Sequence, residues 1–220
     1  MQAEENSETL DWRDGVPVSR QFDDPYFSLQ DGLAETHHVF LSGNDLPARF
    51  SAGFHVAELG FGTGLNCAAT LAAWRAAGAP GPLRYTSFEA FPLSPEAMDR
   101  ALAAFSALGV AGRDVVAAVA GGGPPDLDLS VVKGDARDTL PVWGGKANAW
   151  FLDGFAPARN PGLWAATLMT EVARHTEPGG SFATYTAAGQ VRRDLAAAGF
   201  AVERVPGYGR KRHMTRGRLA

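Results

Sequence analysis

Three glycines at alternate positions follow a carboxylate in the segment AELGFGTGLN, where Glu58 precedes Gly60, Gly62 and Gly64. The segment comes directly after the apolar stretch FHVAEL, which is typical of a buried strand, and before an alanine-rich stretch that is typical of a helix. Glycine lets a backbone turn sharply and approach a bound molecule closely. A glycine-rich turn between a strand and a helix therefore predicts a ligand-binding site.

The spacing excludes two common nucleotide motifs. A phosphate-binding loop ends in Gly-Lys followed by Ser or Thr, but Leu65 and Asn66 follow the last glycine here. A dinucleotide motif needs its third glycine at the position that Leu65 occupies, and a carboxylate at Glu58 would repel a pyrophosphate. The pattern E-x-G-x-G-x-G instead resembles the cofactor motif of class I methyltransferases. Their cofactor, S-adenosylmethionine, has cationic amino and sulfonium groups and no phosphate.

Three further carboxylates each follow or end a predicted strand. Glu89 ends YTSFE, Asp135 follows VVKG, and Asp153 follows the apolar run AWFL. In the methyltransferase interpretation, Glu89 accepts hydrogen bonds from the ribose hydroxyls, Asp135 lies beside the adenine amino group, and Asp153 faces the transferable methyl. Asp135 also precedes ARDTL, so its alternative role is that of a helix N-cap.

From residue 54 onward, short apolar strands alternate with alanine-rich helices, one of them starting at Ser94 as N-cap with Pro95 at its first position. This alternation predicts an α/β fold with right-handed crossovers. Ligands of such sheets bind beyond the carboxyl ends of the strands. We therefore predict a class I, Rossmann-like methyltransferase domain over residues 54–220, with a mostly parallel sheet and an antiparallel C-terminal strand.

Residues 1–53 do not show this alternation of strands and helices. We predict a small β extension packed on the catalytic domain, with strands in PVSRQFDDPYFS (17–28) and THHVFLSGNDL (36–46). In a strand, His37 and His38 point to opposite faces, so they cannot share a metal ion. With a single cysteine, Cys67, and no spaced His and Asp cluster, no metal site is predicted.

Composition indicates the domain size and the cellular compartment of the protein. The 220 residues are 45% hydrophobic, which is enough for one domain with a substantial core. The lone cysteine excludes an internal disulfide and fits a reducing cytoplasm. The apolar runs are too short to cross a bilayer, and the acidic N-terminal segment does not resemble a signal peptide. We therefore predict a cytoplasmic protein without membrane contact.

Charge is distributed unevenly. The chain carries a net charge of −4, yet six basic residues and one acid lie between Glu203 and the end. Such an end indicates either an anionic partner or a solvated terminal strand. Arg210, Lys211 and Arg212 are the candidate substrate contacts.

Several stretches closely resemble the methyltransferase half of the MnmC family, bacterial enzymes that complete 5-methylaminomethyl-2-thiouridine at the tRNA wobble position. The resemblance runs from about residue 10 to about 214. It rests on LDWRDGVPVSRQFDDPYFS, VFLSGNDLPARF, AELGFGTGLN, WFLDGFAPARNPGLW, PGGSFATYTAAGQVRRDL and GYGRKRHM. The best-known members continue into an FAD-dependent oxidoreductase, whereas this sequence stops at Ala220. It is therefore either a stand-alone methylase or a fragment of such a fusion, and any flavin chemistry belongs to a domain or partner outside it.

The resemblance implies that tRNA is the substrate and that a methyl group passes from S-adenosylmethionine to an aminomethyl nitrogen. Asp153 then accepts a hydrogen bond from the amine and orients it, because an ordinary aspartate with a pKa near ~4 is a poor base for an ammonium. Phe155 walls the amine or stacks on the uracil, while Trp164 belongs to the core. Two alternatives stay open: methylation of another amine, and a binding module that holds the cofactor without turnover.

Overall fold

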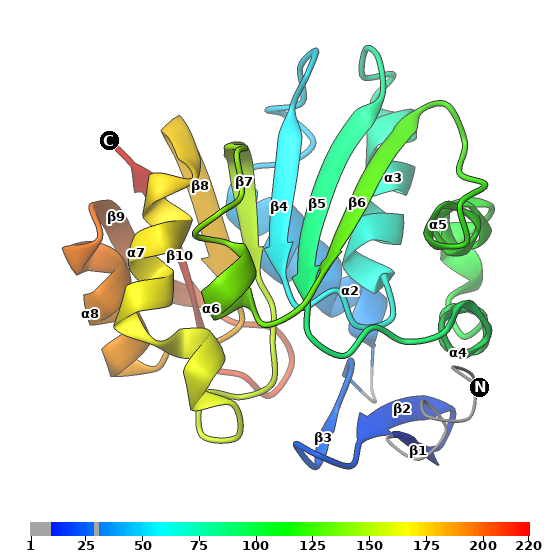
Figure 1. Ribbon diagram of the computed structural model, residues 1–220, viewed down its shortest axis with the longest axis horizontal. Helices are drawn as coiled ribbons and strands as arrows, with labels where there is room; N and C mark the ends of the chain where they lie inside the picture. Colours follow the sequence, from blue (N-terminus) through cyan, green and yellow to red (C-terminus); the bar gives the residue numbers. More distant parts are fainter. Residues whose placement is uncertain (1–9, 29–30) are drawn as a thin grey trace.

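The computed structural model of the chain describes residues 10–28 and 31–220. Within these residues, seven strands form a central sheet in the order β6-β5-β4-β7-β8-β10-β9 (Figure 1). The strands are β4 (His55–Leu59), β5 (Leu83–Glu89), β6 (Leu127–Lys133), β7 (Ala147–Leu152), β8 (Thr176–Thr184), β9 (Phe200–Pro206) and β10 (His213–Leu219). Strands β4 to β8 pair in parallel, and β10 is antiparallel to both of its neighbours. The predicted sheet is confirmed.

Helices cover both faces of the sheet (Figure 1). One face packs on α3 (Leu65–Ala76), α4 (Pro95–Leu102) and α5 (Ala111–Val119), and the other packs on α6 (Ala136–Thr139), α7 (Ala166–Arg174) and α8 (Gly189–Ala197). Strand β7 lies between the two cores, so Trp150 enters one core and Phe151 the other. Burial on both faces explains why this strand is a nearly continuous apolar run.

Two helix starts illustrate local sequence control. The hydroxyl of Ser94 accepts a hydrogen bond from the amide of Ala97 at 3.3 Å, and Pro95 opens α4, as predicted. Helix α5 was not predicted, because its sequence AGRDVVAAV has no side-chain N-cap and follows Gly109 and Val110.

No helix among the described residues is long and apolar enough to cross a membrane.

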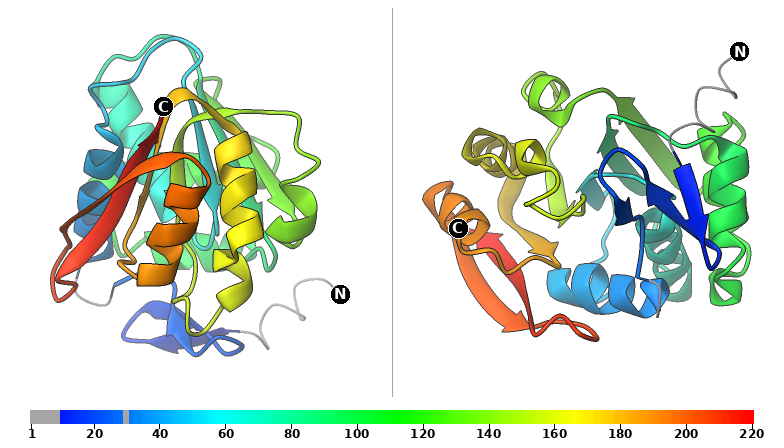
Figure 2. Two further views of the ribbon diagram at one scale, coloured as in Figure 1. Left: turned by 90° about the vertical axis from the view of Figure 1, so that its left-hand side faces the viewer. Right: turned by 90° about the horizontal axis from the view of Figure 1, so that it is seen from below.

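The N-terminal residues form a small antiparallel sheet of β1 (Leu10–Arg13), β2 (Val16–Ser19) and β3 (Asp24–Pro25). Seen from below, this sheet lies in front of the carboxyl ends of the central strands (Figure 2). The strands predicted within residues 17–28 are present there, although β3 has only two residues.

The strand predicted over residues 36–46 is wrong. The segment is helical, with α2 (Gly32–Thr36), a π-helical turn η1 (His37–Leu41) and a 3-10 turn η2 (Ser42–Asn44). Asp31 caps α2 by accepting a hydrogen bond from the amide of Ala34 at 2.9 Å, and the segment packs against α3 and β8. A short apolar run has no clear period, so its tertiary contacts decide between helix and strand.

The two histidines of this helical segment lie in different environments. His38 Nε2 lies 3.1 Å from the carbonyl oxygen of Pro206, and His37 is exposed. Among the described residues, no group of three or more His, Cys, Asp or Glu side chains is placed to hold a metal ion. Cys67 is buried in the core of α3.

Candidate active site

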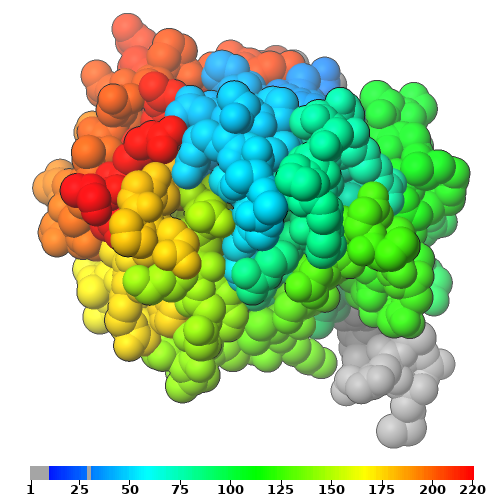
Figure 3. All heavy atoms as spheres, turned by 90° about the horizontal axis from the view of Figure 1, so that it is seen from above, coloured from blue at the N-terminus to red at the C-terminus, as the bar shows by residue number. Residues whose placement is uncertain are grey.

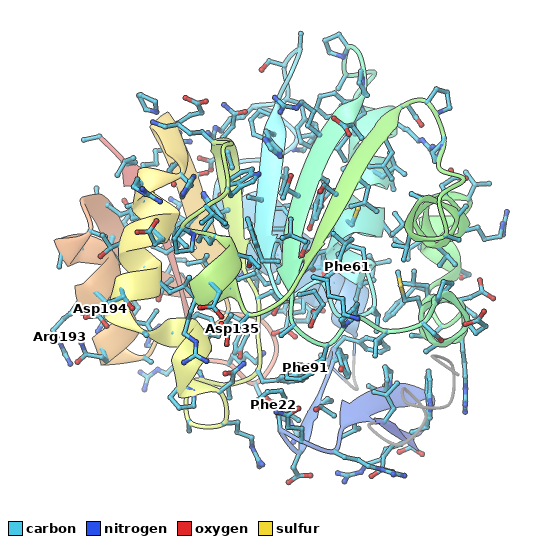
Figure 4. The ribbon with its side chains drawn as sticks, viewed as in Figure 1. Phe22, Phe61, Phe91, Asp135, Arg193 and Asp194 are labelled. Atoms are coloured by element: carbon cyan, nitrogen blue, oxygen red, sulfur yellow. The ribbon has the colours of Figure 1, made fainter. Side chains whose placement is uncertain are left out.

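A cavity of about 1060 Å³ lies at the carboxyl ends of the central strands. The glycine turn after β4, the ends of β5 and β7, the N-terminal segment and the turn between β9 and β10 all contribute to its lining. Figure 4 shows Phe22, Phe91 and Asp135 gathered at this edge of the sheet. The volume is at the upper end of the range of roughly 300–1,000 Å³ for small-molecule sites, which leaves room for a cofactor and part of a second molecule.

The glycine turn has a backbone that only glycine adopts easily. Gly60, Gly62 and Gly64 have φ values of 89°, 53° and 79°. A Cβ at Gly60 would collide with the carbonyl oxygen of Asp153, and one at Gly62 would lie 3.0 Å from the ring of Tyr26. Gly60 and Gly62 line the cavity, as expected of ligand-contacting residues. Gly64 does not, and a Cβ there would lie 3.0 Å from Met98 Cε, so the glycine lets α3 start close to α4.

Glu89 connects the glycine turn to the loop after β5. Its Oε2 accepts a hydrogen bond from the amide of Gly62 at 3.0 Å, and its Oε1 accepts one from the amide of Phe91 at 2.8 Å. The side chain lines the cavity. Each carboxylate oxygen has a second lone pair, so Glu89 can also accept hydrogen bonds from a ligand.

Asp135 is the N-cap of α6 and also lines the cavity. It accepts a hydrogen bond from the amide of Arg137 at 2.8 Å and pairs with the guanidinium of the same residue. Hydrogen bonding to Arg137 lowers the pKa of this carboxyl, which stays ionised. Asp135 is therefore a helix N-cap, as the alternative predicted, and it also forms part of the cavity wall.

A buried asparagine joins two of the predicted carboxylates. Asn66 Nδ2 donates to Glu58 Oε1 at 2.9 Å and to Asp153 Oδ2 at 2.7 Å. Asn66 Oδ1 accepts a hydrogen bond from Thr36 at 2.8 Å, which fixes the orientation of the amide. Asn66 lines the cavity, whereas Glu58 is 0% exposed and lies behind it. Sequence reasoning overlooked Asn66, although a polar residue in the first turn of an apolar helix beside a ligand turn was a usable signal.

Both carboxyl groups are perturbed by their surroundings. Burial, followed by the charge of Asp153, raises the pKa of Glu58 well above its ordinary value. Burial also raises the pKa of Asp153 to about 7, against the lowering effects of the Asn66 hydrogen bond and the Lys211 charge. Asp153 therefore exchanges a proton near neutral pH, unlike the ordinary aspartate that its sequence context suggested.

The three basic residues predicted to contact substrate lie in different environments. Arg210 and Lys211 line the cavity and Arg212 does not. Lys211 Nζ lies 2.7 Å from Glu35 Oε1 and 4.0 Å from the ring centroid of Tyr185. This ion pair joins the turn between β9 and β10 to α2 at the cavity. Neither Glu35 nor Tyr185 was a candidate in the sequence, because only the fold brings them to this edge.

Aromatic side chains from the N-terminal segment pack on the loop after β7. The ring of Phe155 stacks on Phe22 with centroids 4.7 Å apart and meets the ring of Tyr26 edge to face at 5.1 Å. Asp24 accepts a hydrogen bond from the amide of Ala156 at 3.0 Å and fastens β3 to the same loop. Trp164 is buried, as expected, and donates to the carbonyl oxygen of Phe155 at 2.9 Å.

Comparison with known proteins agrees with this arrangement. Residues 123–220 match the model of a family described as S-adenosyl-L-methionine-dependent methyltransferase. The chain is 45% identical over 231 residues to the tRNA 5-methylaminomethyl-2-thiouridine biosynthesis bifunctional protein MnmC of Chromobacterium violaceum, and 44% identical over 230 residues to that of Pseudomonas aeruginosa. The chain is similar to S-adenosylmethionine-dependent methyltransferases and to part of MnmC. These alignments cover 96% and 94% of this chain, which spans about a third (34%) of the length of either relative.

Solved structures support the fold. A crystal structure of MNMC2 from Aquifex aeolicus aligns with 96% of this chain and 70% of that chain, at a TM-score of 0.78 and 24% identity. The S-adenosylmethionine-bound amino pentose methyltransferase CalS10 aligns with 88% of this chain and 92% of that chain, at a TM-score of 0.51 and 12% identity.

The lining of the cavity fits S-adenosylmethionine. Gly60 and Gly62 line the cavity and carry no side chain, so a ligand can approach the main chain there. Glu35, Glu89 and Asp153 line the cavity, and carboxylates in such a position favour a cationic amino or sulfonium group.

Proposed function

We propose that this chain methylates the aminomethyl nitrogen of 5-aminomethyl-2-thiouridine at the wobble position of tRNA, giving 5-methylaminomethyl-2-thiouridine. The printed names of its relatives, which it matches at 41–46% identity, support this substrate. The observation that carries the proposal is the Asp153 carboxylate, which lines the cavity, is hydrogen-bonded to Asn66 and has a pKa of about 7.

For cofactor binding we assign Gly60, Gly62, Glu89 and Asp135 to direct contact. Glu58 and Gly64 take a supporting role in this assignment, because neither lines the cavity. Glu58 holds Asn66, and Gly64 allows α3 to start close to α4. When bound, S-adenosylmethionine supplies an electrophilic methyl group on its sulfonium.

Asp153 prepares the nucleophile in this proposal. A primary alkyl ammonium with a pKa near ~10 must lose a proton before its nitrogen lone pair can form a bond to carbon. Moving that proton to a carboxylate with an ordinary pKa near ~4 costs about 8 kcal/mol, at 1.36 kcal/mol per unit. With the Asp153 pKa at about 7, the cost falls to about 4 kcal/mol. Asp153 thus accepts the proton and also aims the amine, since Asn66 holds its Oδ2 in place.

The substrate nucleoside enters from the side of the N-terminal segment. We assign Phe155, supported by Phe22, to the wall that the uracil contacts, because flipped or unstacked bases commonly pack on aromatic side chains. Arg210 and Arg212 are assigned to the RNA backbone. Lys211 has a different assignment: paired with Glu35, it holds the turn against α2 and biases Asp153 toward its ionised form.

Further parts of the proposal concern the setting of the reaction. Residues 1–53 act as an extension that completes the cavity of a catalytic domain formed by residues 54–220. An FAD-dependent oxidoreductase, within a longer protein or as a separate partner, supplies the aminomethyl substrate. The reaction takes place in the cytoplasm, where tRNA is modified.

The test is methyl transfer from labelled S-adenosylmethionine to tRNA purified from cells that lack this methylation step. We expect label in 5-methylaminomethyl-2-thiouridine after nuclease digestion, and none when tRNA from cells with the complete modification is used. Label in a different amine would indicate the alternative substrate class. Binding of S-adenosylhomocysteine without any transfer would indicate a non-catalytic binding module, and either result would overturn the proposal.

A further inference from the structure

A group of cationic side chains lies on the outer part of the sheet, outside the cavity. Arg204 of β9 pairs with Thr215 of β10, and His213 pairs with Pro206, so Arg204 and His213 lie on the same face at neighbouring positions. Helix α8 packs on β9 at this face and carries Arg192. Arg212 directly precedes β10. We call Arg192, Arg204 and Arg212 the basic patch.

The patch is electrostatically connected. Partial burial and the charges of Arg204 and Arg212 lower the pKa of His213, and Arg192 contributes to the same effect. All three guanidinium groups therefore act on one imidazole. Like charges gathered on one face raise the local positive potential, which favours an anion there.

Over residues 10–28 and 31–220, no acidic side chain is paired with the basic patch. Among the described residues, none of the three patch arginines forms an ion pair, and the buried Nε of Arg192 has no hydrogen-bond partner. On the outer side of α8, Gln190 bonds Arg193 at 2.8 Å and Asp194 at 2.7 Å, so Asp194 is engaged there (Figure 4). Uncompensated arginines on a chain with a net charge of −4 indicate a surface for an anionic partner.

Two other arginines on β10 provide a contrast. Arg216 pairs with Glu203 at 3.1 Å, and Arg218 pairs with Asp45 at 2.6 Å. They lie toward the amino ends of the parallel strands, where the end of β10 lies beside the residues that follow η2 (Figure 3). The cationic end of the sequence is thus divided into a neutralised part, far from the cavity, and an uncompensated part.

The patch continues from the mouth of the cavity. The turn between β9 and β10 lines the cavity through Tyr208, Arg210 and Lys211, and Arg212 follows immediately. Strand β9 ends and β10 begins at the carboxyl edge of the sheet (Figure 2). Arg204 lies two residues before the end of β9 and Arg212 directly precedes β10, so both residues are near this edge. A polyanion whose reacting group enters the cavity would pass over these residues.

We infer that Arg192, Arg204 and Arg212 form the surface that binds the backbone phosphates of the tRNA, on the outer side of α8 and β9. The inference rests on the proposed function and deepens it by assigning a docking face. Guanidinium groups suit this role because they bind phosphate oxygens in a bidentate manner. Each phosphate contact releases counterions, so each contributes a salt-dependent increment to affinity.

The experiment measures tRNA affinity as a function of salt concentration for four forms of the whole chain. The first is the wild type, the second is the triple variant Arg192→Gln, Arg204→Gln and Arg212→Gln, and the third is the matched control Arg216→Gln with Arg218→Gln. We expect the triple variant to lose roughly 2–3 units of the slope of log affinity against log salt, and the control less than about 1 unit. A fourth form with lysine at the three patch positions should keep most of the slope, because lysine preserves the charge.

Calorimetry with S-adenosylhomocysteine checks that each variant retains its cofactor site. A triple variant that binds S-adenosylhomocysteine and tRNA with wild-type affinity and slope would overturn the docking face and leave the proposed function standing. Equal slope losses in the triple variant and the control would also overturn it. If wild-type protein neither binds nor methylates tRNA, the proposed function fails and the docking face fails with it. Loss of slope in the triple variant alone supports the inference.

Discussion

Asn66 Nδ2 lies 2.7 Å from Asp153 Oδ2, and this contact connects the helix after the glycine turn to the end of β7. The same nitrogen donates to the fully buried Glu58, so one amide holds two carboxyl groups that would otherwise repel each other. A carboxylate at a cavity wall is useful for catalysis only if it is both oriented and able to accept a proton. Asn66 orients it, and burial raises its pKa to about 7.

The first prediction concerns Asp153. Asp153→Asn keeps the size of the side chain and removes its ability to accept a proton, so methyl transfer should fall by about 10²–10⁴-fold. Affinity for S-adenosylhomocysteine, measured by calorimetry, should stay within a few-fold of wild type. The control is Asp138→Asn, an exposed carboxylate of α6 that does not line the cavity. Turnover of the Asp153 variant near that of the control would show that another group prepares the amine.

The second prediction concerns Asn66 and pH. The hydrogen bond from Asn66 lowers the pKa of Asp153, so Asn66→Leu should raise that pKa above about 7. Transfer requires the ionised carboxylate, and its rate rises with pH through the pKa. The rising limb of the rate profile should therefore move to higher pH in the variant, with the largest loss of rate at acidic pH.

Thr70→Val is the control for this shift. Thr70 lies one turn further along α3 and is buried, but its hydroxyl donates only to the backbone oxygen of Asn66 at 2.6 Å. The control should keep the wild-type profile. A variant Asn66→Leu that loses rate equally at every pH would contradict the electrostatic role and leave Asn66 as a packing residue.

The third prediction concerns Glu89. Glu89→Ala removes the acceptor for the amides of Gly62 and Phe91 as well as the proposed acceptor for the ribose hydroxyls. Affinity for S-adenosylmethionine should weaken by about 1–3 kcal/mol, the cost of leaving such partners unsatisfied in a pocket. Glu89→Gln, which retains one acceptor oxygen, should lose less. Unchanged affinity in calorimetric titration of the alanine variant would remove Glu89 from the cofactor site.

The sequence by itself determined the sheet and the turn that carries the site. Strands and helices from residue 54 onward have distinct periods, and the glycines at 60 and 62 need φ values that few other residues adopt. The placement of Glu89, Asp135 and Asp153 at the cavity follows, because parallel strands present their carboxyl ends at one edge.

Tertiary structure decided the conformation of residues 36–46 and the pairing and protonation of the site residues. Residues 36–46 are helical because they pack on α3 and β8, which a short apolar run cannot reveal. Glu58 lies behind Asn66, and Lys211 pairs with Glu35 across 176 positions of sequence. The pKa of Asp153 depends on its burial and on the charges of Lys211 and Glu35, which come from opposite ends of the chain. Residue type and spacing thus locate an edge of the sheet, whereas protonation and pairing depend on distances between side chains that are remote in sequence.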